Sequence, residues 1–584
     1  MSGFCGIVSP GARNRIPSQL LLGAGADAVG AKGDLHIRNA FIGKFGEDKC
    51  FSTYRGPDKT LFVCHDGVTL NAKEMKRSFA APDLGSLLAS IAAKDMENFP
   101  SLLRGGFAGF VWDESLNIGS LYTNHFGTRF LYYYYAERLG ATFFASSLAD
   151  IAVMLRSAGI EPKLDTTAAY SILSFGYMFD DRTLIEGVRK LEAGCSMAIE
   201  PGKKPALHRY FSYDNETIHT DSLGDLIDGF YERMAQAVRQ GFEKDLEYGY
   251  RHVSLLSGGL DSRMVLFFAK KLGFENILTF TFGQSGCADE RIASAISRDL
   301  GYDHLFRVLD GGDFLSRTIE DCVEANDGMI IYAGSAHAFS SYRMLDWGKY
   351  GLLHNGNLAD ASQGDYVETD YHVKPSAEEW AYSRRFLPRI EEAVNDALSR
   401  FPNHEAFAIA TRGSNAIVNG SVSAQGFTET DEPFLYPDLA GWAAGIPPKF
   451  KKGEYLFLAM IEKHFPEATR YVWQKWRLKP TLINKRRMES PPFRFVHRGR
   501  KALGYFVDGI LRRPSRWDMN PLDLWYKNNT DLRGEFQKRR GMIEERLSSR
   551  PGLAEDCARL FDEGSFLEKA QVLTLVAAVT RLDL

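Results

Sequence analysis

The stretch Val253-Ser-Leu-Leu-Ser-Gly-Gly-Leu-Asp-Ser-Arg263 decides the fold of the larger part of this chain. Its apolar start is typical of a buried strand, the glycine pair breaks the strand, and residues 264–271 continue with helical periodicity. The turn therefore lies at a helix N-terminus, where free N–H groups and the helix dipole attract anions. Gly258 and Gly259 allow an anion to approach the backbone closely, and Asp261 can share a hard cation with phosphate oxygens. We interpret the turn as a nucleotide pyrophosphate site.

The order of residues in this turn distinguishes it from other phosphate loops. It lacks the Gly-Lys-Ser/Thr ending of the Walker loop and is not the Gly-x-Gly-x-x-Gly of dinucleotide-binding folds. Ser257-Gly-Gly-Leu-Asp-Ser262 after a hydrophobic strand instead resembles the PP-loop of enzymes that cleave ATP between its α and β phosphates. This resemblance implies that a carboxylate or carbonyl oxygen is adenylated and that pyrophosphate leaves.

Length and composition indicate an ordinary globular protein of two or three domains. The 584 residues are 45% hydrophobic, and the net charge of −4 is small, so no nucleic-acid partner is expected. The seven cysteines form no C-x-x-C pair, which argues against a disulfide framework and a zinc site. Without a signal peptide or an apolar run long enough for a transmembrane helix, the chain is expected to be cytoplasmic.

The first two hundred residues contain many short strands and few helices, which favours antiparallel sheets with a helical layer. Gly105-Gly-Phe-Ala-Gly-Phe-Val-Trp-Asp113, Asn124-His-Phe-Gly-Thr-Arg-Phe-Leu-Tyr132 and Phe144-Ala-Ser-Ser-Leu148 resemble, in order, the class II glutamine amidotransferase domain of asparagine synthetases. The resemblance implies an N-terminal Ntn-type antiparallel sandwich with helices over residues 1–212.

The glutaminase site of that family is altered here, so we predict a degenerate domain. Cys5 aligns with the family's N-terminal nucleophile, but four residues precede it, and cleavage after Phe4 would be needed to expose its amine. The pair Asp66-Gly67 replaces Asn-Gly, and losing that oxyanion donor costs on the order of a hundredfold in turnover. Lys44 replaces the arginine that binds the glutamine carboxylate, while Asp83 remains as a partner for the glutamine amine.

A polar linker at residues 213–222 precedes a second domain, residues 223–584. Strands and helices alternate after Val253, which predicts a doubly wound parallel sheet, with helical additions, whose ligands bind at the carboxyl ends of the strands. Leu352-Leu-His-Asn-Gly-Asn-Leu-Ala-Asp360 resembles the family's second signature and implies Asp360 as a second ligand of a catalytic Mg²⁺ beside Asp261. Asn357 occupies the variable position of that loop, and an amide cannot accept a proton near neutral pH.

Further site residues follow from the same resemblance. Glu429, in Glu429-Thr-Asp-Glu-Pro-Phe-Leu435, aligns with a carboxylate beside the acceptor site, and Lys479 aligns with a lysine that stabilises charge on the adenylate. With Asn357 these are the predicted catalytic residues. The predicted nucleotide-binding residues are Leu256, Ser257, Gly258, Gly259, Leu260, Asp261, Ser262, Phe282, Asn355 and Gly356.

The sequence therefore predicts an asparagine synthetase-like ligase that uses ATP and Mg²⁺ to join a small-molecule or peptide carboxylate to a nitrogen donor. Alternatives are a β-lactam or macrolactam cyclase, amidation of a surface-sugar uronic acid, and a non-catalytic ATP-binding scaffold. A homodimer is compatible with these predictions.

Segments 369–419 and 475–516 resemble the family least. Within the second, the cationic amphipathic run at 496–513 fits a solvated helix face, an acidic peptide, a phosphorylated donor or a membrane surface.

Overall fold

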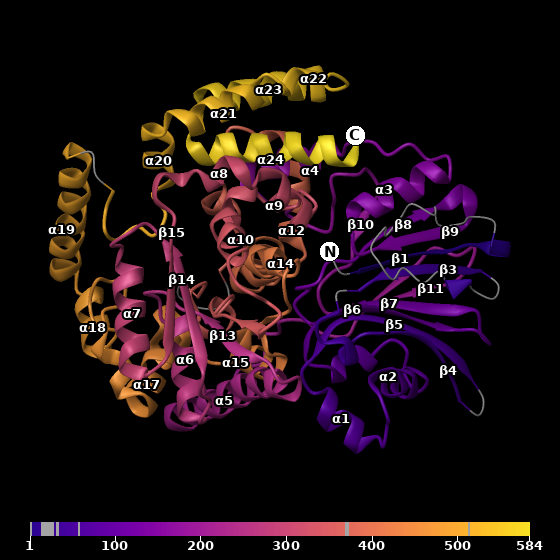
Figure 1. Ribbon diagram of the computed structural model, residues 1–584, viewed down its shortest axis with the longest axis horizontal. Coiled ribbons are helices and arrows are strands. Elements are labelled where there is room, and N and C mark those ends of the chain that lie inside the picture. Colours follow the sequence, from indigo (N-terminus) through magenta and orange to yellow (C-terminus); the bar gives the residue numbers. More distant parts are fainter. Residues whose placement is uncertain are drawn as a thin grey trace.

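A computed structural model describes residues 3–12, 29–30, 34–41, 43–56, 59–367, 373–511 and 514–584. Figure 1 shows two halves side by side: antiparallel strands built from the first part of the chain, and a parallel sheet surrounded by helices. The last antiparallel strand ends at Arg209, and the long helix α5 (Leu223–Glu247) starts the second half after its N-cap Ser222.

Two antiparallel six-stranded sheets form the first half. The first has the order β10-β8-β9-β1-β3-β2 and the second the order β12-β11-β7-β6-β5-β4. The strands of the first sheet are β1 (Gly3–Val8), β2 (Val29–Gly30), β3 (Leu35–Ala40), β8 (Tyr132–Ala136), β9 (Ala141–Ala145) and β10 (Arg189–Lys190). Those of the second are β4 (Cys50–Arg55), β5 (Thr60–Thr69), β6 (Gly105–Asp113), β7 (Ile118–Thr123), β11 (Cys195–Ile199) and β12 (Ala206–Arg209).

Side-chain alternation along the strands creates the layers of this half. Phe4 and Phe110 pack between the two sheets, whereas Cys5 and Ile7 point to the outer side of the first sheet. Helices α3 (Leu148–Ser157) and α4 (Thr166–Phe175) pack in that same outer cluster, and α1 (Ala72–Ser78) and α2 (Leu84–Ala92) cover the second sheet. The predicted Ntn-type sandwich is confirmed.

The second half contains a five-stranded sheet of order β15-β14-β13-β16-β17, in which every neighbouring pair is parallel. Its strands are β13 (Arg251–Leu255), β14 (Ile277–Gly283), β15 (Asp303–Val308), β16 (Tyr350–His354) and β17 (Thr430–Asp431). One face packs against α5, α6 (Asp261–Lys271) and α7 (Ala288–Leu300), and the other against α9 (Ile319–Asn326) and α10 (Ala336–Tyr342). The predicted doubly wound parallel sheet is confirmed.

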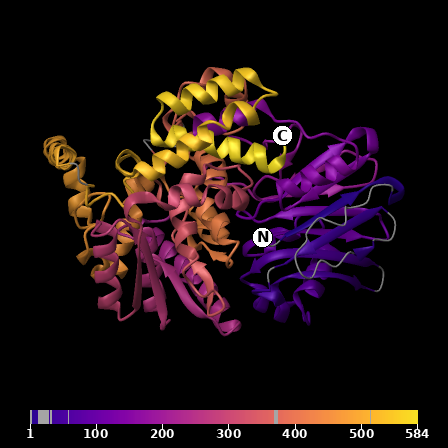
Figure 2. The ribbon, with the colours of Figure 1, turned by 45° about the horizontal axis from the view of Figure 1, so that its top comes forward.

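The C-terminal helix α24 (Phe566–Leu582) joins the two halves. It packs against α4 of the first half and α9 of the second, and it lies across both in Figures 1 and 2. Gln571 donates to the carbonyl of Ile172 (2.9 Å), and Arg156 donates to the carbonyl of Leu582 (2.8 Å). Both halves therefore share one apolar core. Among the described residues, every helix is too short or too polar to cross a bilayer.

Candidate functional site

The turn after β13 is held in shape by its own serines. The amide of Ser257 donates to Ser262 Oγ (3.0 Å), and the amide of Gly259 donates to Ser257 Oγ (3.1 Å). Gly258 N–H bonds the Asp289 carboxylate (2.9 Å), and a Cβ at Gly258 would come within 2.9 Å of Gln474 Cβ. The turn thus needs glycine here, and it sits at the start of α6, where an anion is favoured.

The loop after β16 lies directly against this turn because β13 and β16 are neighbours in the sheet. A Cβ at Gly356 would come within 2.5 Å of the Ser262 nitrogen, so the two loops meet backbone to backbone. Leu358 has a φ of 55°, a left-handed conformation that costs roughly 1 kcal/mol for a residue with a side chain. The loop thus keeps a backbone suited to glycine although its sequence has leucine.

Asp261 and Asp360 come together where these loops meet. Gln363 Nε2 donates to Asp261 Oδ1 (2.9 Å), and burial raises the pKa of Asp261 to about 6. Burial, Asp365 and Asp261 raise the pKa of Asp360 well above its usual range. Buried carboxylates this close to one another are stabilised in ionised form by a cation, and oxygen donors are what Mg²⁺ prefers. The donor set therefore fits the Mg²⁺ that the sequence predicts.

A lysine that the sequence analysis missed contacts this carboxylate cluster. Lys475 Nζ lies 2.9 Å from Asp365 Oδ1 and 2.6 Å from Glu454 Oε1. Lys475 and the predicted Lys479, four residues further along the same loop, are both exposed, but Lys475 makes the ion pairs with these carboxylates. The sequence could not show which of the two lysines contacts the carboxylates, because the loop of residues 473–479 has no regular period that would predict side-chain directions.

Two further predicted nucleotide-binding residues, Leu256 and Phe282, lie at the ends of the neighbouring strands β13 and β14. Leu256 N–H donates to the carbonyl of Phe280 (3.0 Å), which continues the β13–β14 ladder past its last paired residue. The Phe282 ring lies beside His337, with 5.4 Å between centroids. The segment 515–519 covers the end of β14, because Gln284 N–H donates to the carbonyl of Met519 (2.9 Å).

Glu432 is a second residue that the sequence analysis missed. Its Oε1 lies 3.4 Å from Asn355 Nδ2, and its side chain bonds Ser421. Ser421 Oγ in turn accepts a hydrogen bond from Asn357 Nδ2 (3.0 Å). Burial raises the pKa of Glu432, yet part of the residue and part of Asn357 remain exposed. The carboxylate of Glu432, which can accept a proton, thus lies close to the amide of Asn357, which cannot.

Glu429, unlike Glu432, is held in a buried network of ion pairs. Its carboxylate lies between Arg129 Nη2 (2.6 Å) and Lys49 Nζ (2.9 Å), and Asp66 pairs with the same two cations at 2.9 and 3.8 Å. Burial alone would raise the pKa of Glu429, but Arg129 and Lys49 lower it to about 2. This buried quartet has two charges of each sign and joins the antiparallel half to β17 of the parallel sheet.

The other positions that the resemblance assigns to a glutaminase site also have structural partners. Lys44 Nζ donates to the carbonyls of Trp347 (2.7 Å) and Tyr350 in the second half. Asp83 caps α2 by accepting from Ser86 N–H (2.7 Å). Gly67 has a φ of 115°, and a Cβ there would strike the carbonyl of Gly106.

Cys5 lies within β1, paired with β3 and β9, and it is fully buried. Burial and Asp150 raise the pKa of its thiol well above the usual range. Because the thiolate is the reactive form, this thiol is a poor nucleophile in the described structure.

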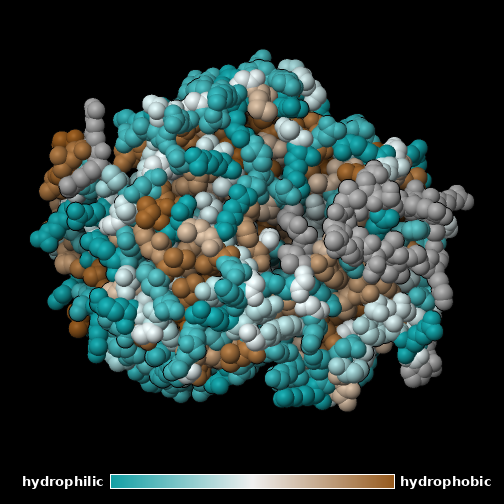
Figure 3. Space-filling model, viewed as in Figure 1, coloured by the Kyte–Doolittle hydropathy of each residue, from teal (hydrophilic) through white to brown (hydrophobic). Residues whose placement is uncertain are grey.

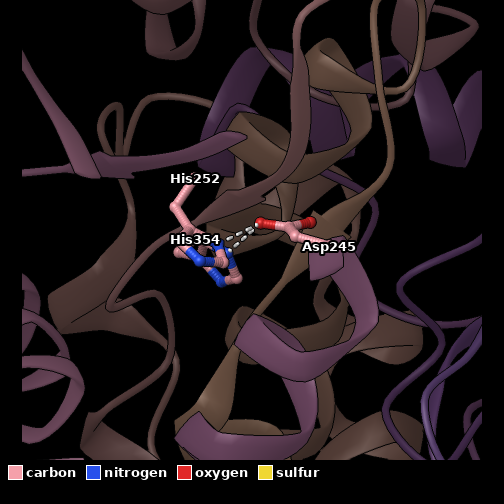
Figure 4. A group of neighbouring side chains, drawn as sticks. All are labelled: Asp245, His252 and His354. Carbon is pink, nitrogen blue, oxygen red and sulfur yellow. Dashed lines mark hydrogen bonds and ion pairs between the residues drawn. The ribbon is translucent and has the colours of Figure 1, made fainter. Parts of the chain in front are cut away.

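A buried histidine network supports the strands beneath the site (Figure 4). Asp245 Oδ2 accepts from His252 Nδ1 and His354 Nε2, both at 2.9 Å, and His354 Nδ1 lies 2.7 Å from Asp431 Oδ2. Leu352 N–H donates to the other Asp245 oxygen (2.7 Å). Burial would lower the pKa of His354, but Asp245 and Asp431 raise it to about 9. A protonated His354 thus links α5, β16 and β17.

Comparisons with known proteins agree with this arrangement. Residues 56–211 match the family model of the glutamine amidotransferase domain, and residues 229–390 match that of asparagine synthase. The glutamine-hydrolyzing asparagine synthetase 1 of Bacillus subtilis (strain 168) is 23% identical over 311 residues, which are 51% of this chain and 47% of that protein. Amidase chry2 of Gibberella zeae is 29% identical over 362 residues, covering 54% of this chain and 51% of that protein.

The chain thus spans about half the length of these curated relatives. Among solved structures, the glutamine phosphoribosylpyrophosphate amidotransferase from B. subtilis is similar at 12% identity with a TM-score of 0.24, over 52% of this chain and 75% of that chain. That likeness is too low to carry an argument.

Replacing Glu429 by glutamine is expected to destabilise the protein, because it leaves two buried cations facing Asp66 alone. Breaking a buried ion pair in this way costs about 3–5 kcal/mol, so the unfolding temperature should fall by several degrees in calorimetry. The matched control is Glu563→Gln, which breaks the exposed pair with Arg385 and should change little. Equal unfolding temperatures for the two variants would contradict the bracing role of the quartet.

The His354 network predicts a loss of stability in alkali. Its folded pKa of about 9 lies above the usual value of 6.5, so its contribution is complete below pH 6.5 and disappears as the pH rises through 9. The shift corresponds to about 3 kcal/mol. Unfolding temperatures measured between pH 6.5 and 9.5 should fall in the native protein and less in His354→Gln, with His208→Gln as the control. Parallel pH profiles for all three proteins would rule the network out.

Proposed function

We propose that this chain, which matches the asparagine synthase and glutamine amidotransferase family models in part, is an ATP-dependent amide-forming ligase of the asparagine synthetase family. In this proposal it adenylates a substrate carboxylate, releases pyrophosphate and transfers the acyl group to a nitrogen nucleophile. The observation that carries the proposal is the junction of the β13 and β16 loops, where Asp261 and Asp360 meet at the carboxyl ends of the strands. In open parallel sheets, ligands bind at this edge.

The chain's own residues account for the first step. The N-terminus of α6 and the hydroxyls of Ser257 and Ser262 offer hydrogen-bond donors to the pyrophosphate of ATP. Asp261 and Asp360 would hold Mg²⁺, which neutralises charge on the leaving pyrophosphate when bound. Lys475 adds a positive charge beside these carboxylates, and the two loops fix the reacting groups relative to each other.

The second step needs a group that removes a proton from the nitrogen nucleophile. Asn357 cannot do this, and Glu429 has a pKa of about 2 and is held by Arg129 and Lys49. Among the described residues, Glu432 is linked to Asn357 through Ser421, and its pKa is raised. We assign Glu432 as the general base, because a base works best when its pKa approaches the working pH.

The nitrogen does not come from glutamine hydrolysed in the first domain. In the described structure the thiol of Cys5 is buried with a raised pKa, and Asp66 bonds Arg129 where the family has an oxyanion donor. We therefore propose that free ammonia or the amine of a second substrate attacks the acyl adenylate. In this proposal the first domain acts as structural support for the ligase site.

Trapping with hydroxylamine tests the ligase without knowledge of the natural amine. The purified protein is incubated with ATP, Mg²⁺, hydroxylamine and a panel of carboxylates that includes aspartate and uronic acids, and hydroxamate and pyrophosphate are measured. Pyrophosphate should form stoichiometrically with a hydroxamate, and Asp261→Asn or Asp360→Asn should lower the rate at least a hundredfold. Asp303→Asn, on the exposed end of β15, is the control.

Replacing hydroxylamine by ammonium salts should support amide formation, whereas glutamine should not. Turnover with glutamine that disappears in Cys5→Ala would refute the proposed loss of glutaminase function. Hydroxamate formation that persists in both aspartate variants would refute the proposed site.

Glu432→Gln separates the two chemical steps. Acyl transfer to ammonia should fall about a hundredfold or more when a general base is lost, while exchange of labelled pyrophosphate into ATP should persist, because adenylation needs no base. The native transfer rate should fall as the pH drops through the raised pKa of Glu432, and the variant should lose that dependence. Loss of exchange and transfer to the same extent would assign Glu432 a structural role instead.

A further inference from the structure

Helix α19 (Pro491–Ile510) exposes an apolar face to solvent. Five of its large apolar side chains are more than half exposed: Phe495 81%, Phe506 65%, Ile510 65%, Leu503 62% and Val496 54%. At helical spacing these positions fall on one side of the helix, because residues three, four and seven apart share a face. Figure 3 shows a brown apolar patch in the region where Figure 1 places α19.

A different face attaches α19 to the rest of the protein. The less exposed positions are 493, 497, 501, 504 and 508, which again are three or four residues apart. Lys501 Nζ donates to the carbonyl of Lys475 (2.7 Å), and Tyr505 OH donates to Asp518 (2.9 Å). The apolar face therefore points away from the body, and α19 lies at one end of the molecule in Figures 1 and 2.

The flanks of the apolar face are strongly cationic. Arg494, Arg498 and Arg500 are exposed on α19, and Arg486 and Arg487 are exposed on the preceding helix α18 (Leu482–Glu489). The charged side chains of α19 are four cations and one carboxylate, whereas the whole chain has a net charge of −4. Positive charge is thus concentrated around this one face.

We propose that α19 binds in the plane of an anionic lipid bilayer. A helix with aromatic and aliphatic side chains on one face and arginines along its edges inserts that face among lipid acyl chains, while the arginines contact anionic headgroups. A second copy of this chain is a poorer occupant, because a symmetric contact would place the same arginines of both copies opposite one another.

Helix α19 is connected to the candidate site through Lys475. Lys475, which holds α19 through its carbonyl, contacts Asp365 and Glu454 beside Asp360. The chain that follows α19 leads into segment 515–519, which covers the end of β14. Docking of α19 would therefore hold the candidate site close to the membrane surface, within reach of a carboxylate or amine carried by a lipid. The docking itself does not depend on the proposed ligase activity.

Vesicle flotation of the full chain tests the proposal. Wild-type protein should float with vesicles of phosphatidylcholine and phosphatidylglycerol, and at least tenfold less with phosphatidylcholine alone. High salt should weaken the binding, because headgroup attraction is screened. Phe495→Glu/Phe506→Glu and Arg494→Glu/Arg498→Glu should each lower the bound fraction at least tenfold. Leu116→Glu, which changes a side chain 58% exposed on the first domain, should float like the wild type.

Circular dichroism and unfolding temperatures establish that each variant is folded, and hydroxamate formation in the absence of lipid should be unchanged in all of them. Three results would overturn the proposal. One is wild-type protein that binds neither kind of vesicle, and another is equal flotation of the Phe495→Glu/Phe506→Glu variant. The third is concentration-dependent dimerisation in light scattering that this variant abolishes, which would identify a second copy as the occupant.

Discussion

The adjacency of β13 and β16 in the middle of the parallel sheet is the constraint on which the site depends. The chain leaves β13 toward β14 on one side, and it enters β16 on the other side about a hundred residues later. The two following loops therefore meet at one edge, and Gly356 lies so close to Ser262 that no side chain fits between them. This close contact brings Asp261 and Asp360 together.

A second constraint is the buried quartet that joins the two halves. Lys49, Asp66 and Arg129 come from the antiparallel half, and Glu429 immediately precedes β17 in the parallel half. A buried charge without its partner is strongly unfavourable, so the four groups hold one another in place. Asp66, which is incompatible with an oxyanion hole, is compatible with this ion-pair network. The predicted glutaminase positions Asp66 and Lys44 thus take part in the interface between the two halves.

The ion pairs of this quartet also change which glutamate near β17 we assign to proton transfer. Resemblance pointed to Glu429, but its partners hold it ionised and away from proton transfer. Glu432, three residues later, bonds Asn355 and Ser421 at the edge of the site. The network of His354, Asp245 and Asp431 supports the strands beneath both glutamates. Neighbouring acidic residues of one segment thus have three different tasks: bracing, supporting the sheet and facing the site.

The sequence alone predicted the antiparallel and parallel sheets and the glycine turn after the strand at Val253, because strand alternation, helical period and glycine turns are local properties of the chain. The family resemblance of their two motifs also predicted that Asp261 and Asp360 belong to one site. Only the tertiary structure decided that Glu429 pairs with Arg129, 300 residues earlier, that Lys475 rather than Lys479 contacts the carboxylates, and that the apolar face of α19 is uncovered. Ion pairing and burial depend on which distant segments pack together, and spacing along the chain does not encode that.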